Sequence, residues 1–213
     1  MVQAATTQEL MRAVSEASFV DFLDYVKVLE PPPGLSVIPF EKWEHLESLA
    51  HTLRTERLVV ILKARQVGVS WLLAAYALWT ALYHKGAVVL MLSKGQHEAG
   101  DLVDKVKFIH TQLHPALQQP VGTDSGTEIS FPTMMSKVTA LPSTEHAGRS
   151  ETASLVIQDE ADFHEHLDTN YAAVKPTIEA GGQLIQASTA NKFKMTSLFK
   201  QIYRGARGDA SRA

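Results

Sequence analysis

The stretch from residue 57 to residue 73, which reads RLVVILKARQVGVSWLL, constrains the fold of this chain more than any other. The apolar, largely β-branched run over residues 58–62 has the length and composition of a buried strand. Gly68 then lies in a short loop, and Ser70 opens a second apolar stretch of helical length. The sequence therefore predicts a strand, a loop and a helix N-terminus in direct succession.

The loop partly matches a pattern that binds phosphate groups. That pattern is Gly, four residues, then Gly-Lys-Ser/Thr, in which backbone N–H groups cradle phosphates and the hydroxyl reaches Mg²⁺. Gly68 and Ser70 fit its second half, but Lys63 stands at the first glycine and Val69 at the lysine. Lys63 or Arg65 could supply positive charge from the other end of the loop. The alternative is an ordinary buried strand and turn.

Composition limits the remaining possibilities. A chain of 213 residues with 45% hydrophobic and 20% charged residues is typical of one globular domain, with or without a small appendage. The absence of cysteine excludes disulfides and thiolate metal sites, and together with the lack of a signal peptide it favours a reducing interior. No apolar run approaches the roughly 20 residues that span a bilayer. A net charge of −3 excludes a globally basic coat for nucleic acid, so any DNA contact must come from a local patch or a partner.

Apolar patterns predict the other elements. A capping box at Thr6 and Glu9 begins a predicted helical segment that ends before the prolines at 31–33, and a second helix is expected over 40–53. Further strands are predicted at 87–92, 153–157 and 183–187, with helices over 70–82 and from about residue 96 onward. A hairpin is predicted from 127–131 and 137–141. Strands that alternate with helices indicate an α/β fold with a mostly parallel central sheet flanked by helices.

Unusual polar residues follow the predicted strands at their carboxyl ends, where ligands bind in such sheets. Asp159 and Glu160 end one strand and are costly to desolvate without a compensating partner. In phosphate-loop ATPases the first carboxylate of such a pair holds Mg²⁺ and the second orients the attacking water. The alternative is an acidic helix N-terminus, where carboxylates complement the helix dipole.

Taken together, four segments resemble the large terminase subunit of tailed bacteriophages, over roughly residues 35–200. These are KARQVGVS at 63–70, LP at 141–142 with GR at 148–149, LVIQDEADF at 155–163, and STAN at 188–191. The resemblance implies a RecA-like P-loop ATPase of the ASCE type, with ATP and Mg²⁺ as cofactors. It also implies residue roles. Ser70 and Asp159 would bind the metal, Glu160 would align water, and Arg149 would serve as an arginine finger for a neighbouring subunit or, alternatively, form a surface salt bridge.

The resemblance assigns nucleotide contacts as well. Ser188, Thr189 and Asn191 would sense the γ-phosphate, although Asn191 also suits a plain strand exit. Phe40 and Trp43 would line the adenine side, although aromatic residues at helical spacing are more often part of the core. The phosphate loop itself would be formed by eight residues: Lys63, Ala64, Arg65, Gln66, Val67, Gly68, Val69 and Ser70.

Three domain segments are expected: an N-terminal segment on the adenine side (1–56), the ATPase core (57–203), and a flexible tail or the start of a lid (204–213). Asp209 is the only acid after Asn191, so we expect no nuclease activity in this chain. His164 and His166 fit a solvated loop better than a zinc site. The basic residues near the C-terminus could meet DNA phosphates or form a solvated face.

The function that the resemblance implies is an ATPase motor that drives viral DNA into a procapsid. Its partners would be double-stranded DNA, the portal protein, the small terminase subunit and further copies of the chain in a five-membered ring. It would work in the cytoplasm of the infected bacterium, at the portal, without a membrane. The alternatives are a helicase or other DNA translocase, which would need a second lobe or a hexamer interface, and a nucleotide-binding docking module without turnover.

Overall fold

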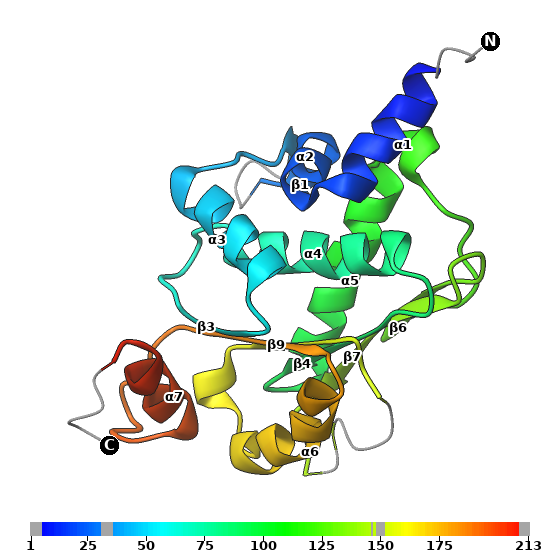
Figure 1. The fold of residues 1–213 in the computed structure, drawn as a ribbon. Coiled ribbons are helices and arrows are strands. Elements are labelled where there is room, and N and C mark those ends of the chain that lie inside the picture. The colour runs from blue at the N-terminus through cyan, green and yellow to red at the C-terminus, as the bar shows by residue number, and fades with distance from the viewer. Residues whose placement is uncertain (1–5, 31–35, 146, 148–151, 209–213) are drawn as a thin grey trace.

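The computed structural model describes the chain apart from residues 1–5, 31–35, 146, 148–151 and 209–213. Its centre is a seven-stranded sheet with the order β3-β9-β8-β4-β7-β6-β5, which crosses the middle of Figure 1. The strands from β3 to β7 in this order are parallel, and β6 and β5 continue the sheet antiparallel at one edge. The predicted α/β fold with a mostly parallel sheet is therefore confirmed.

The strands of this sheet are β3 (Leu58–Leu62), β4 (Val88–Ser93), β5 (Asp124–Ser125), β6 (Glu128–Phe131), β7 (Ser136–Pro142), β8 (Leu155–Asp159) and β9 (Gln183–Ser188). A separate antiparallel pair consists of β1 (Lys27–Leu29) and β2 (Val37–Pro39). The helices are α1 (Thr7–Ala17), α2 (Phe19–Phe22), α3 (Glu44–Thr55), α4 (Val69–Tyr83), α5 (Gln96–Gln112), α6 (Leu167–Glu179) and α7 (Leu198–Ala206). Short 3-10 turns are η1 (Leu23–Tyr25), η2 (Pro115–Leu117) and η3 (Ala161–Phe163).

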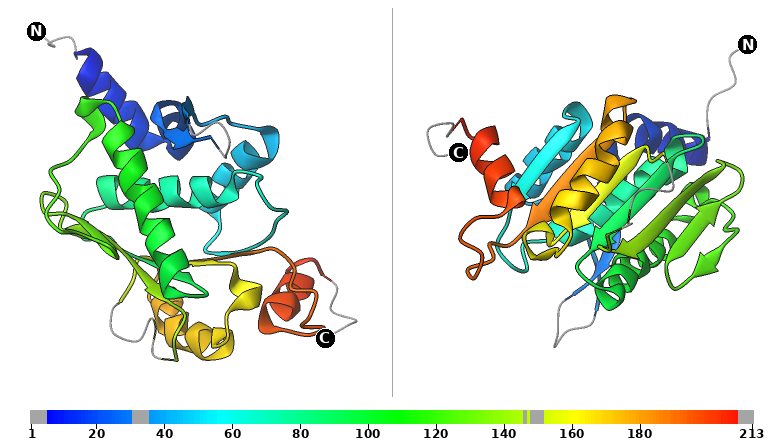
Figure 2. Two further views of the ribbon diagram at one scale, coloured as in Figure 1. Left: turned by 180° about the vertical axis from the view of Figure 1, so that it is seen from behind. Right: turned by 90° about the horizontal axis from the view of Figure 1, so that it is seen from below.

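Helices cover both faces of the sheet. Successive side chains of a strand point to opposite faces, so a strand that is covered on both sides is apolar except where buried polar side chains bond to one another, as Gln186 does to Gln158. In β8, Leu155 and Ile157 lie in the main core with α4 and α5, whereas Val156 lies in a second cluster with Val174 of α6. Figures 1 and 2 show α6 and α7 on one side of the sheet and α3, α4 and α5 on the other. This double cover explains the continuous apolar runs in the sequence.

Strand β9 lies between β3 and β8, although it follows both in the chain. Leu62 at the end of β3 pairs with Ser188, and Asp159 at the end of β8 pairs with Ala187. The carboxyl ends of these three strands therefore meet at one edge of the sheet. This strand order brings the loop after β3, the acidic end of β8 and the polar end of β9 together.

The N-terminal segment differs from its prediction. The capping box at Thr6 is present, but α1 ends at Ala17 because Ser18 is extended, with φ −138°, and caps the short helix α2. Phe19 and Phe22 are buried, whereas Leu10 is 59% exposed. Burying the two phenylalanines against α4 requires a change of direction that a continuous helix does not allow. The segment then ends in strand β1, which helical spacing did not predict.

The other predictions of secondary structure are confirmed, with limited changes at element ends. The hairpin forms from β6 and β7, and the helix expected over 40–53 begins only at Glu44. Helix α7 extends to Ala206 and so contains the boundary that was expected at residue 203. In the part of the chain that the structure describes, no helix is both long and apolar enough to cross a membrane.

Candidate functional site

The loop after β3 is shaped by Gly68. This residue has φ +78°, in the left-handed region that favours glycine, and directly precedes α4. A Cβ atom there would lie 2.8 Å from the Leu46 side chain of α3. Val69 is 4% exposed and belongs to the core, and its side chain does not line the cavity that opens over Asp159 and Glu160. The residue at the usual lysine position of the loop therefore supplies no charge.

Lys63 supplies a cation at the centre of the site. Its Nζ lies 3.1 Å from Asp159 Oδ1 and 3.1 Å from Glu160 Oε1. The same Nζ is 3.4 Å from the Ser70 hydroxyl, which donates a hydrogen bond of 3.0 Å to Asp159 Oδ2. The Lys63 side chain is only 9% exposed. One ammonium group thus joins residues from the loop after β3, the first turn of α4 and the end of β8.

Charge pairing between Lys63 and Glu160 shifts the pKa of both side chains. Burial alone would raise the pKa of the Glu160 carboxyl, but the charge and hydrogen bond of Lys63, with the hydrogen bonds from Thr189, hold that pKa below its usual value. Burial alone would lower the pKa of Lys63, but the two carboxylates outweigh it and raise the pKa. Both residues are therefore charged at neutral pH.

Thr189 connects β9 to Glu160. Its backbone N–H and its hydroxyl donate to Glu160 Oε2, at 3.2 and 3.0 Å. Glu160 has φ +52°, which a non-glycine residue adopts at a cost and keeps only when its surroundings hold it. Its side chain remains 29% exposed, so it can still meet a ligand in the cavity. The Glu160 carboxylate is thus held from both sides, by Lys63 and by Thr189.

The oxygens of Ser70 and Asp159 suit a magnesium ion. Neighbouring ligands of an octahedral Mg²⁺ with bonds of about 2.0–2.1 Å lie about 2.9 Å apart. The separation of 3.0 Å between the Ser70 hydroxyl and Asp159 Oδ2 agrees with that geometry. Among the described residues no group of three or more His, Cys, Asp or Glu could hold a metal. Water and phosphate oxygens would have to complete the coordination, as is usual for Mg²⁺.

A cavity of about 410 Å³ opens directly over these residues. Arg65 and Gln66 line it from the loop after β3, and Lys94 and Lys105 line it from the region of α5. Lys94 follows a predicted strand at the edge of the sheet where ligands are expected, whereas nothing in the local pattern of Lys105 places it near residues 63–70. Glu98 and Asp101 line it as well, so the cavity is lined by as many acidic as basic side chains. A polyanion would bind there together with a metal ion that offsets the carboxylates.

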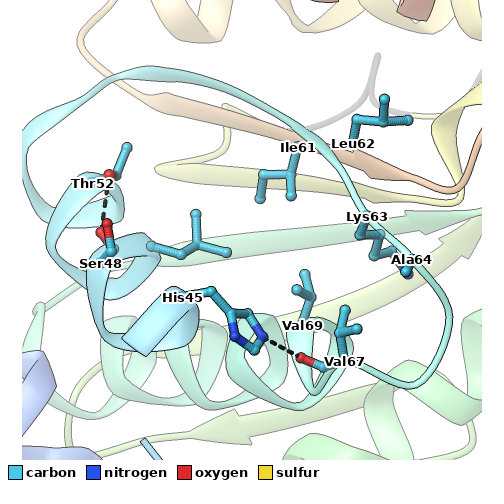
Figure 3. A pocket seen from close by; sticks show the side chains of 10 residues that line it. His45, Ser48, Thr52, Ile61, Leu62, Lys63, Ala64, Val67 and Val69 are labelled. Atoms are coloured by element: carbon cyan, nitrogen blue, oxygen red, sulfur yellow. Dashed lines mark hydrogen bonds between the residues drawn. The ribbon is translucent and has the colours of Figure 1, made fainter. Parts of the chain in front are cut away.

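A second cavity, of about 460 Å³, lies between α3 and the loop after β3. Figure 3 shows apolar side chains on one wall and the ring of His45 on the other, with His45 Nε2 3.0 Å from the Val67 carbonyl oxygen. Ser48 and Thr52 line it from α3. Lys63 lines both cavities, so they adjoin at the start of the loop.

The two aromatic residues expected beside the adenine lie outside both cavities. Phe40 is 7% exposed and packs in the main core. Trp43 is 47% exposed, caps α3 and donates to Glu41 through its indole N–H. Neither residue lines either of the two cavities next to the loop, and a role in base binding stays a prediction.

The remaining predicted residues lie at the end of β9 or outside the described part of the chain. Ser188 is fully buried, and its hydroxyl accepts from the Asp162 N–H. Asn191 is 9% exposed, and its N–H donates to the Asp162 carboxylate. Arg149 lies outside the described residues, so its role as an arginine finger stays a prediction.

His164 also differs from its prediction. It is 1% exposed and not solvated, and its Nε2 lies 2.8 Å from the Asp159 carbonyl oxygen. Burial lowers its pKa against the opposing effects of that hydrogen bond and the nearby carboxylates. His164 therefore fastens the end of β8. Its sequence neighbourhood showed only an HxH pattern, which does not predict burial.

The order of the strands, with β9 between β3 and the acidic strand β8, is that of a RecA-like fold. Solved structures that share it include phage large terminases and the ATPase domain of one of them. The large terminase of bacteriophage HK97 is 14% identical over 98% of this chain and 42% of that chain, with a TM-score of 0.69. The ATPase domain from Thermus phage P74-26 is 18% identical over 77% of this chain and 70% of that chain, with a TM-score of 0.62.

A third similar structure is the large terminase of another thermophilic bacteriophage, solved in complex with ADP. It is 11% identical over 64% of this chain and 34% of that chain, with a TM-score of 0.50. By sequence, the chain matches no protein-family model and no curated protein. At these identities the comparisons establish the fold, and this chain spans less than half of the HK97 protein.

Proposed function

We propose that this chain is the ATP-hydrolysing motor domain of a phage large terminase. The observation that carries the proposal is the cluster of Lys63, Ser70, Asp159 and Glu160, joined by contacts of 3.0 to 3.4 Å at the base of the 410 Å³ cavity. The triphosphate would bind in that cavity, with Lys63 and the loop N–H groups toward its oxygens. The shared fold of the terminase ATPase domains supports this assignment.

Each residue of the site would then have a separate role in hydrolysis. Ser70 and Asp159 would hold a magnesium ion, which neutralises charge on the β- and γ-phosphates when bound. Glu160, ionised and held by Thr189, would accept a hydrogen bond from the attacking water and align it. Arg149 of a neighbouring copy would stabilise charge in the transition state. The polyanion would draw Lys63 away from the two carboxylates as it binds.

The first test is release of phosphate from ATP. Mg²⁺-dependent release that disappears with EDTA is expected, and its rate per chain should rise with protein concentration if Arg149 acts between copies. Nucleotide binding without turnover at any concentration would favour the docking module instead. No binding of Mg²⁺-ATP at all would refute the proposal.

The second cavity is proposed to take the adenine base, because it adjoins the phosphate loop and is walled by Ile61, Leu49 and Val69. Replacing the exposed Ser48 with tryptophan should fill it without disturbing the core. We expect the Kd for ATP to rise about tenfold, which corresponds to about 1.4 kcal/mol, while the Kd for inorganic triphosphate is unchanged. Ser48→Ala is the matched control and should bind both ligands as the unmodified chain does. Equal losses for both ligands would place the base elsewhere.

The wider role is proposed from the terminase likeness. The domain would act on double-stranded DNA at the portal of a procapsid, in the cytoplasm of an infected bacterium. It would cooperate with a small terminase subunit and with further copies of itself in a ring of five. Stimulation of phosphate release by double-stranded DNA in the presence of the portal would support this role.

A further inference from the structure

Asp162 is a buried acid that the proposed chemistry does not use. It lies on η3, two residues after Glu160, and is 1% exposed. Its Oδ2 accepts a hydrogen bond of 2.6 Å from the Asn191 N–H and pairs with Lys200 Nζ at 3.3 Å. Its Oδ1 accepts from the Ser197 hydroxyl. A carboxylate with this many partners is built to hold segments together, because a buried charge is stable only when paired and hydrogen-bonded.

Lys200 extends the same network. It lies in α7, and its Nζ also donates to the carbonyl oxygens of Asn191, at 2.6 Å, and Lys194. The chain between β9 and α7 is therefore fastened at both ends to one ion pair. Phe199 next to Lys200 is 1% exposed and packs with Ala161 of η3. Helix α7 thus sits directly on the turn that follows Glu160.

The end of β9 contacts both acids of that turn. Thr189 donates to the Glu160 carboxylate, whereas the Ser188 hydroxyl accepts from the Asp162 N–H at 3.0 Å. Bound nucleotide can change the first contact, because Glu160 faces the cavity. It does not reach the second, because Asp162 and Ser188 are buried. A change in the Thr189–Glu160 contact therefore acts on one end of a segment whose other end is held by Asp162 and Lys200, the pair that also holds α7.

We propose that Asp162, paired with Lys200, is a positioning residue that couples the alignment of Glu160 to the placement of α7. This inference rests on the proposed ATPase function. The ion pair holds the strained turn at Glu160 in place and carries a change in the Thr189–Glu160 contact to the helix. Coupling between the Glu160 turn and α7 requires an element whose position depends on both of them. The segment between β9 and α7 is that element.

The test uses the whole chain with Asp162→Asn, Lys200→Met, Lys200→Arg and, as the matched control, Lys192→Met. Lys192 is an exposed cation of the same segment. Steady-state turnover of Mg²⁺-ATP and nucleotide binding are measured at the same protein concentration. Hydrogen exchange of residues 198–206 is measured with and without Mg²⁺-ATP.

We expect Asp162→Asn and Lys200→Met to lower kcat on the order of 10- to 100-fold, as small misplacements of a reacting group do. KM should stay within about twofold, since ground-state binding is untouched. Mg²⁺-ATP should alter exchange in α7 of the unmodified chain but not of these two variants, although they still bind nucleotide. Lys200→Arg should recover most of the rate, and Lys192→Met should equal the unmodified chain.

If Asp162→Asn and Lys200→Met keep the kcat of the unmodified chain and its change of hydrogen exchange in α7, the inference is overturned while the proposed function stands. A rise in KM with an unchanged kcat would overturn it as well. An unmodified chain that neither binds nor hydrolyses ATP would refute the proposed function and the inference together. If Asp162→Asn does not fold, Ser197→Ala is used instead. It removes one hydrogen bond to Asp162 and leaves the charge of the carboxylate in place. It should lower kcat and weaken the α7 response, and full activity with a full response would count against the coupling.

Discussion

Replacing Glu160 with glutamine is expected to abolish ATP turnover while nucleotide binding survives. Glutamine keeps the size of the side chain but removes the charge that accepts a hydrogen bond from the attacking water. A positioned acid or base contributes about 10²- to 10⁴-fold to such reactions, so kcat should fall by that factor. Single-turnover phosphate release and the Kd of a fluorescent ATP analogue measure the two effects separately.

Glu165→Gln serves as the control for Glu160→Gln, because Glu165 is an exposed acid of the same chain segment. It should hydrolyse ATP at the unmodified rate. If Glu160→Gln kept full turnover, the assignment of Glu160 as the residue that aligns water would be wrong. If it lost binding instead, the carboxylate would belong to the metal site.

Replacing Lys63 with methionine is expected to weaken both triphosphate binding and the fold. A hydrogen bond to a charged group contributes about 1.5–3 kcal/mol, so the Kd for ATP should rise on the order of 10- to 100-fold. The empty protein would also be left with two adjacent carboxylates and no counterion. Breaking a buried pair in this way costs about 3 kcal/mol of the free energy of unfolding at pH 7.

The pH dependence of this stability loss follows from the pKa shifts. The lowered pKa of Glu160 contributes stability above the usual value of about 4.3, and that contribution disappears as the pH falls through the folded-state value. The raised pKa of Lys63 contributes stability below about 10.4, and that contribution disappears as the pH rises through the folded-state value. The difference between Lys63→Met and the unmodified chain should therefore be largest from about pH 5 to about pH 10. Denaturant unfolding at several pH values measures it.

Magnesium gives a second readout for Lys63. Because the ammonium group occupies the position between the two carboxylates and Ser70, it competes with a cation in the empty protein. Mg²⁺ without nucleotide should stabilise Lys63→Met more than the unmodified chain. Lys175→Met removes a surface pair with Glu179 and should change stability by less than about 0.5 kcal/mol at any pH. Equal stability of Lys63→Met and the control would show that the Lys63 cluster does not hold the site together.

Much of the sheet could be predicted because each buried strand has a local signature. The run over residues 58–62 is apolar throughout, the run over residues 183–187 is apolar except for Gln183 and Gln186, and the structure forms β3 and β9 there. The polar residues after these runs marked the edge of the sheet where the site lies. The N-terminal segment could not be predicted in the same way, because the burial of Phe19 and Phe22 against α4 outweighed a good helical pattern.

The candidate site was predicted in part. Ser70 and Asp159 were paired by their motif positions, and their oxygens lie 3.0 Å apart. The motif left Lys63 and Arg65 as equal candidates for the cation, and only the structure places Lys63 inside the cluster. Asp162 was missed, because an acid two residues after Glu160 shows no local sign of burial.

The sequence by itself determined which segments become the parallel strands of the main sheet and which residue types end them, because burial on both faces favours apolar runs and strand ends admit polar residues. Only the tertiary structure decided which of those ends meet. The placement of β9 between β3 and β8 depends on crossovers and packing between segments far apart in the chain, and no local pattern encodes it. That placement joins Thr189 to Glu160 and Asp162 to α7, and with them the candidate site to the rest of the molecule.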